Sequence, residues 1–130
     1  MFDIPVTLRA AGRADVDVAW ERYVDFAKWS DWSPQILGVE TAAARIAPGV
    51  TGRVRGPLGV RVSFVVETVD ELARTWSWVA TFGPIRLWLG HAVWARGAGC
   101  ATSLQVRGPA PVVAAYAPLA RFALGRLVRP

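Results

Sequence analysis

Residues 26–36 read FAKWSDWSPQI and place two tryptophans, Trp29 and Trp32, three positions apart, with Pro34 two positions after the second. Proline lacks a backbone N–H and disfavours helical geometry in the residue before it, so a helix that reaches this stretch ends by Ser33. The stretch therefore predicts a helix end followed by a tight, aromatic corner. The rest of the chain has to provide the surface against which this corner packs.

The residues before the corner predict a strand and then a helix. The first ten residues, MFDIPVTLRA, have the composition of a strand, and Asp15 is a favourable N-cap residue. After Asp15, apolar side chains recur at helical spacing, at Val16, Trp20, Tyr23 and Ala27. We expect a strand, a helix and the aromatic corner in this order.

The residues after the corner contain regularly spaced turn signals, with segments of strand length between them. These signals are Pro48-Gly49, Gly56-Pro57, Asp70-Glu71, Gly83-Pro84, Gly97 to Gly99 and Gly108-Pro109. Residues 60–67 and 75–82 alternate between apolar and polar side chains, which predicts strands with one buried face. Residues 85–96 are apolar on both sides, so we expect that strand to be covered on both faces.

Residues 110–128 predict a long helix that packs on a sheet formed mainly by residues 36–106. Its apolar residues at helical spacing are Val112, Tyr116, Leu119, Ala123 and Leu127. We expect the side with the first four of them to face the concave side of the sheet. Arg121, Arg126 and Arg129, together with the internal Pro118, make a membrane-spanning position costly, so an interfacial membrane helix is only the minor alternative.

The composition fits one globular domain that spans residues 1–130. Hydrophobic residues make up 53% of the sequence and charged residues 19%, so much apolar surface must be buried or must line a cavity. The net charge of +5 comes mostly from arginines spread singly along the chain. This distribution indicates solvated surface charge and argues against nucleic acid as a partner.

Several kinds of chemistry lack support in the sequence. The single cysteine, Cys100, cannot form an internal disulfide, and the single histidine, His91, leaves too few ligands for a clustered metal site. The chain has no nucleophile elbow, dinucleotide-binding glycine turn or phosphate loop, so we predict no metal and no cofactor. The N-terminal residues include Asp3 and have no long apolar run, which predicts a cytoplasmic protein without a signal peptide.

The order of elements and several motifs resemble a known superfamily. The motifs are Val18 and Trp20 in the first helix, VDFAKWSDWSP over residues 24–34, VVETVDELARTWSW over residues 65–78 and GHAVWARGAGCATSLQVRGP over residues 90–109. With these residues the chain resembles the START-related SRPBCC superfamily, most closely its polyketide cyclase/dehydrase and lipid-transport branch. The resemblance implies an α+β helix-grip fold, in which a seven-stranded antiparallel sheet wraps around a long C-terminal helix, with one or two short helices after the first strand.

The resemblance also implies a cavity for an apolar small molecule between the sheet and the long helix, because members bind lipids, polyketides, hormones and aromatic intermediates. Trp29 and Trp32 would wall this cavity or its mouth. Packing in the core is the alternative, which we favour for Trp32 and weigh equally for Trp29. The further candidate ligand-binding residues are Phe64, Trp76, Trp78, Leu89 and Leu119, whose positions in the predicted strands and helix turn them inward.

His91 and Tyr116 are the candidate catalytic residues. His91 lies on the same side of its strand as Leu87, Leu89 and Val93, where it would stay neutral and could act as a general acid or base on an enolisable substrate. A hydrogen-bonded structural histidine is the alternative. Tyr116, on the inner side of the long helix, could donate a hydrogen bond to a carbonyl or a phenolate.

Two functions stay open at this point, besides a third class, an interaction module that docks on a partner protein or a membrane through the second apolar face of the strand with Trp88. The first is a cyclase or dehydratase that orients a polyketide-like chain in the apolar cavity, without a metal or nucleotide cofactor. The second is a non-catalytic carrier or sensor that holds a lipid or another hydrophobic ligand. On the opposite side of the sheet, Trp88 and Trp94 would expose apolar surface, and a homodimer that covers them is the partner we predict besides the ligand.

Overall fold

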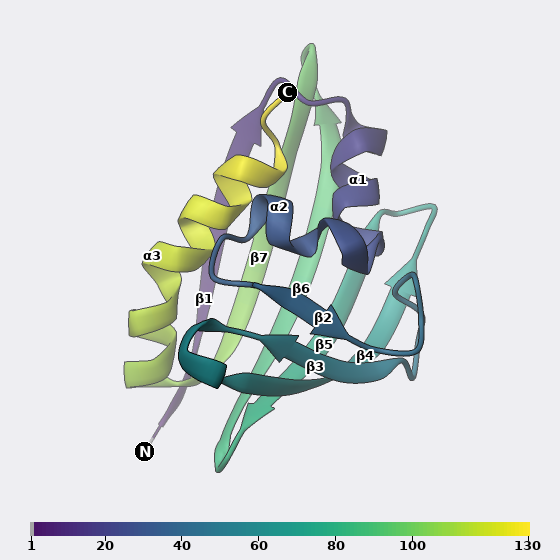
Figure 1. Ribbon diagram of the computed structural model, residues 1–130. Helices are drawn as coiled ribbons and strands as arrows, with labels where there is room; N and C mark the ends of the chain where they lie inside the picture. Colours follow the sequence, from purple (N-terminus) through teal and green to yellow (C-terminus); the bar gives the residue numbers. More distant parts are fainter. Residues whose placement is uncertain (1) are drawn as a thin grey trace.

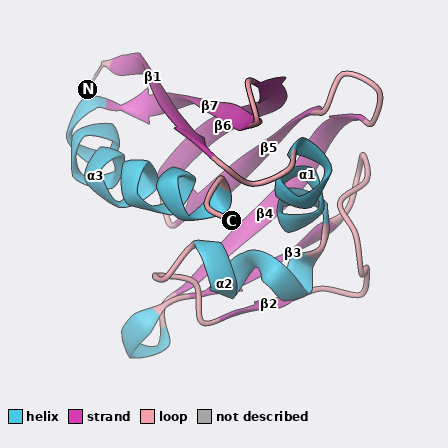
Figure 2. Cartoon of the chain, turned by 90° about the horizontal axis from the view of Figure 1, so that it is seen from above, coloured by secondary structure: helices cyan, strands magenta, loops and turns pink. Residues whose placement is uncertain are grey.

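The computed structural model describes residues 2–130 and shows a curled sheet with its helices on the concave side (Figures 1 and 2). The elements are β1 (Asp3–Gly12), α1 (Val16–Val24), η1 (Phe26–Lys28), α2 (Trp29–Trp32), β2 (Gly38–Glu40), β3 (Thr51–Arg55), η2 (Pro57–Gly59), β4 (Arg61–Asp70), β5 (Thr75–Phe82), β6 (Ile85–Arg96), β7 (Gly99–Pro109) and α3 (Ala110–Leu127). Here η marks a short 3₁₀ helix. The predicted α+β helix-grip architecture is confirmed.

The sheet has seven antiparallel strands in the order β1-β7-β6-β5-β4-β3-β2. Strands β2 to β7 follow one another along the chain, and β1 pairs with β7 from Asp3 opposite Pro109 to Gly12 opposite Cys100. The pairing of β4 with β5 shifts its register between Val66 and Thr68, and such a bulge bends and twists a strand. The curl of the sheet encloses the space that α3 and the corner fill (Figure 2).

Helix α3 contacts β1 and β7 along the inside of the sheet (Figure 1). Its buried residues are Val113, Ala120, Ala123, Leu124 and Leu127. The prediction for Leu119 is wrong, because its side chain lies on the outer side of α3 and is 50% exposed. The helix also carries exposed apolar residues such as Phe122, so the hydrophobic pattern alone did not define which side meets the sheet.

No helix within residues 2–130 is both long enough and apolar enough to cross a membrane.

The outer side of β6 carries Trp88 and Trp94, as the alternation predicted. The Trp88 indole packs on its own sheet: its Nε1 donates to Glu67 Oε1 at 3.0 Å, and the Arg107 guanidinium lies 5.8 Å from its ring centre. The Trp88 ring also covers Gly90, where an added Cβ would lie 2.6 Å from a ring carbon. Trp94 is 40% exposed, and a homodimer that covers it stays a prediction.

Candidate ligand-binding site

The aromatic corner is a helical stretch that is interrupted by one extended residue and ended by another. Helix α1 begins at its N-cap Asp15, whose side chain accepts from the Asp17 N–H at 2.8 Å, and it ends at Val24. Asp25 is extended, and its side chain accepts from the Ala27 N–H at 3.0 Å to start η1. Ser33, before Pro34, is extended again and ends α2. The predicted helix end and tight corner are therefore confirmed.

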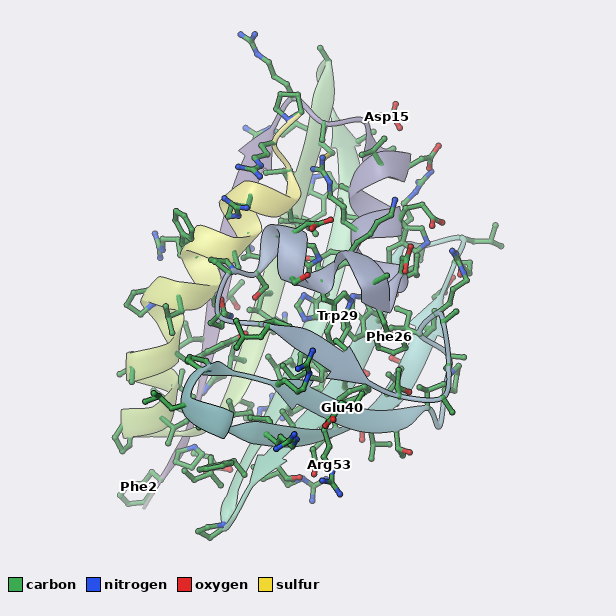
Figure 3. All side chains as sticks on the ribbon, in the orientation of Figure 1. Phe2, Asp15, Phe26, Trp29, Glu40 and Arg53 are labelled. Atoms are coloured by element: carbon green, nitrogen blue, oxygen red, sulfur yellow. The ribbon has the colours of Figure 1, made fainter. Side chains whose placement is uncertain are left out.

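Both tryptophans of the corner point inward and bind the end of α1. Trp29 Nε1 donates to the Tyr23 carbonyl at 2.8 Å, and Trp32 Nε1 donates to the Arg22 carbonyl at 2.7 Å. Carbonyls in the last turn of a helix lack N–H partners within the helix, and the two indole N–H groups provide these missing donors. In Figure 3 the labelled Trp29 and Phe26 lie between the helical segments and the sheet.

An aromatic cluster surrounds Trp29. Its ring centre lies 5.0 Å from Phe26, 5.8 Å from Phe64, 5.7 Å from Trp76 and 5.3 Å from Trp78. Ring pairs at these separations add packing energy beyond the area that they bury. The cluster joins the corner to strands β4 and β5.

The space between the corner, the sheet and α3 contains a cavity with two compartments. The outer compartment has a volume of about 270 Å³ and is bordered by Gln35, Ile36, Val54, Gly56, Pro57, Val60, Val62, Trp78, Ala80, Leu87, Leu89 and Tyr116. The inner compartment has a volume of about 30 Å³ and is bordered by Trp29, Trp32, Ser33, Ile36, Trp76, Trp78, His91, Leu104, Tyr116, Ala120, Ala123 and Leu124. Three residues border both: Ile36, Trp78 and Tyr116.

The two compartments differ in size but share an uncharged lining. Among the residues that the structure describes, no Asp, Glu, Lys or Arg side chain borders either of them. The outer compartment can hold a ring system or an acyl chain, whereas the inner one has room for about one water molecule. The cavity is therefore suited to an apolar molecule with a small group at its inner end.

His91 lies deep in the fold beside the inner compartment and is 5% exposed. Its Nε2 accepts a hydrogen bond from Trp78 Nε1 at 3.0 Å. An indole nitrogen can only donate, so Nε2 carries the lone pair and Nδ1 carries the proton. Burial lowers the pKa of His91 to about 3, so the ring is neutral at physiological pH.

Tyr23 and Tyr116 differ in their surroundings. The Tyr23 ring lies edge-on to His91 with 4.8 Å between ring centres, and its hydroxyl is 2.6 Å from Thr102 Oγ1. Thr102 Oγ1 itself donates to the Ala92 carbonyl, so Tyr23 donates to Thr102. Tyr116 borders both compartments, and burial raises its pKa to about 12. Tyr116 is thus a neutral phenol that faces the ligand space.

The structure places most of the sequence-predicted site residues around the cavity. Those that border a compartment are Trp29, Trp32, Trp76, Trp78, Leu89, His91 and Tyr116. Phe64 is 2% exposed but lies behind the lining, packed against Phe26, Trp29 and Trp78. Leu119 lies outside the cavity, as described above. Contact of any of these residues with a ligand stays a prediction.

Much of the lining of the outer compartment was not predicted from the sequence. Gln35 and Ile36 directly follow Pro34, and Pro57 belongs to the turn between β3 and β4. The apolar alternation of residues 60–66 already contained Val60 and Val62, and this signal could have identified them. Gln35 had no comparable signal. Its buried Oε1 has no hydrogen-bond partner within residues 2–130.

The fold is that of a helix-grip protein, with an uncharged cavity between its sheet, its corner and α3. The family model for polyketide cyclase/dehydrase and lipid transport matches residues 4–130, and the chain belongs to this family. The structure is similar to the crystal structure of Ara h 8.0201, with a TM-score of 0.78 over 97% of this chain and 95% of that one. At 13% sequence identity this similarity concerns the fold alone. A comparison with curated proteins gives no match.

Proposed function

We propose that this protein binds an uncharged, mainly apolar small molecule of polyketide-like or lipid-like character. The observation that carries the proposal is the outer compartment of about 270 Å³, whose lining is aliphatic and aromatic apart from Gln35 and Tyr116. Moving apolar surface from water into such a space is favourable by about 25 cal/mol per Å². A charged ligand would find no counter-ion in the lining that the structure describes.

Filling the outer compartment should weaken binding. We expect Val62→Phe to weaken the binding of the uncharged dye N-phenyl-1-naphthylamine at least about tenfold, because the larger side chain occupies the ligand space and overpacked cavities do not expand freely. Val62 borders the outer compartment, whereas Val65 on the same strand faces outward and is 44% exposed. Val65→Phe is therefore the matched control. Dye fluorescence titrations with both variants measure the effect, and equal affinities for the two variants would contradict the proposal.

Catalysis on the bound molecule is the second candidate function. It is favoured by the position of Tyr116 and His91 at the inner end of a cavity without charged groups, where hydrogen bonds to a developing enolate are strong. In this arrangement His91 donates through Nδ1, since Trp78 occupies its Nε2. The protein would then act as a cyclase or dehydratase that holds its substrate, with Tyr116 and His91 as the catalytic residues.

The variant Tyr116→Phe should show whether the protein is a carrier or an enzyme. The variant loses one hydroxyl, so we expect normal folding and a change in ligand affinity of no more than about tenfold. If the protein is an enzyme, turnover should fall by about a hundredfold or more. The measurement is mass spectrometry of apolar metabolites that have been incubated with the parent protein and the variant. Ligands retained unaltered by both proteins would support the carrier.

A further inference from the structure

Three stacked and hydrogen-bonded rings border the inner compartment. Trp78 and His91 share the Nε1 to Nε2 hydrogen bond of 3.0 Å. The Trp76 ring stacks on both: its centre is 4.6 Å from that of His91 and 5.7 Å from that of Trp78, with interplanar angles of 9° and 15°. The hydrogen bond uses the only polar hydrogen of the Trp78 side chain and the only lone-pair nitrogen of the His91 ring.

This arrangement leaves two donors unused. Neither His91 Nδ1 nor Trp76 Nε1 has a hydrogen-bond partner within the described residues. Both side chains are almost completely buried, with His91 5% and Trp76 2% exposed, and both residues border the same 30 Å³ compartment. An unsatisfied buried donor is costly and rare in native proteins, and a phenylalanine at position 76 would avoid one of them. Two such donors beside one small empty volume indicate a polar group that belongs there.

We propose that His91 Nδ1–H and Trp76 Nε1–H recognise a carbonyl oxygen of the ligand, so that the protein selects apolar ketones or esters and takes them up carbonyl end first. This inference rests on the proposed binding of an apolar molecule and specifies its chemical class. A carbonyl oxygen has two lone pairs and no proton, which matches two donors. The inner compartment is large enough for a group of this size, and the outer one for the apolar remainder.

A carboxylate fits this compartment less well than a carbonyl. The titratable side chains that border it are His91 and Tyr116, both neutral at physiological pH. An anion would therefore lose its hydration without gaining a counter-charge. A single bound water is the other candidate occupant, and it would leave the protein indifferent to the ligand's carbonyl.

Two probes of nearly equal shape test the proposal. In 2-isopropenylnaphthalene a C=CH₂ group replaces the C=O group of 2-acetylnaphthalene. Calorimetric titrations compare both probes with the parent protein, with Trp76→Phe and with the control Trp32→Phe. Trp32 borders the same compartment, but its N–H already binds the Arg22 carbonyl.

We expect Trp76→Phe to weaken binding of the ketone by about fivefold to a hundredfold more than binding of the hydrocarbon. Trp32→Phe should change both affinities by the same factor. Equal losses for the two probes in Trp76→Phe would overturn the carbonyl site and leave the apolar cavity standing. Failure of both probes to bind the parent protein would overturn the proposed function as well.

Two spectroscopic readouts on the parent protein keep the proposal testable if Trp76→Phe does not fold. His91 is the only histidine of the sequence, so ¹⁵N-histidine labelling gives one assigned ring. The ketone should shift the Nδ1–H proton resonance and the hydrocarbon should not. The carbonyl stretching band of the bound ketone should move to lower wavenumber than in an apolar solvent. An unshifted proton and an unshifted band would each overturn the carbonyl site.

Discussion

Replacing Trp29 by alanine is expected to destabilise the protein by about 3–5 kcal/mol, the cost of removing a large aromatic side chain from a packed core. Trp29 is 1% exposed, has five aromatic rings with centres within 6.5 Å of its own and donates to the Tyr23 carbonyl. The substitution therefore removes buried area, aromatic contacts and a hydrogen bond together. Since domains of this size are stable by about 5–15 kcal/mol, a large part of the folded state's stability depends on this one side chain.

Urea unfolding monitored by far-ultraviolet circular dichroism measures the loss. The matched control is Trp94→Ala, which removes a tryptophan that is 40% exposed on the outer side of β6. We expect this variant to change the free energy of unfolding by less than about 1 kcal/mol. A loss for Trp29→Ala no greater than that of Trp94→Ala would show that the corner does not hold the core together.

Acid should destabilise the protein before its carboxylates titrate. The pKa of His91 is lowered by burial from 6.5 to about 3, so the unfolded chain binds a proton below pH 6.5 that the folded chain does not accept. The protein therefore has its full stability, as far as His91 is concerned, above pH 6.5, and its free energy of unfolding decreases as the pH falls toward 3. Between pH 6.5 and 5 we expect a loss of about 2 kcal/mol, at roughly 1.4 kcal/mol per pH unit.

The pH window from 6.5 to 5 isolates His91 from other groups. Asp and Glu side chains titrate mainly below pH 5. Tyr23 packs on the His91 ring and Tyr116 borders the same compartment, but both are neutral throughout this range because burial raises their pKa values. Urea unfolding at several pH values measures how the free energy of unfolding changes with pH. His91→Gln should reduce this dependence on pH. If the free energy of unfolding of His91→Gln depends on pH as strongly as that of the parent protein, another group causes the acid sensitivity.

Local sequence signals predicted the elements and the inward side of the strands. Pro34 marked the end of the helical corner, and the alternation around Trp76 and Trp78 marked the buried side of β5. Leu119 was misplaced because α3 is apolar around much of its circumference, so spacing alone did not define the buried side. The sheet register determines which inward residues meet, and it pairs Trp76 with His91 and Trp78 with Leu89.

The hydrogen bond between Trp78 and His91 illustrates what the sequence could not supply. It joins residues on adjacent strands that are diagonal rather than directly opposite in the register. The proton on His91 Nδ1 follows from this contact, and the unused donor of Trp76 follows from the surroundings of its own ring. They depend on side-chain orientations that no periodicity encodes, although the inward position of each residue was predictable from alternation.

Trp29 and Trp32 donate hydrogen bonds to the last carbonyls of α1 and also line the inner compartment. The same two side chains therefore serve both the folding of α1 and the shape of the cavity. A helix of nine residues does not persist alone in water, so α1 forms cooperatively with the corner that folds back onto it. The same indoles border the inner compartment, and a change of shape there also alters the folding unit. Evolution of new ligand preferences within this scaffold should therefore be concentrated in the outer compartment, at positions such as Val54, Ala80 and Leu87, where substitution leaves α1 and its corner intact.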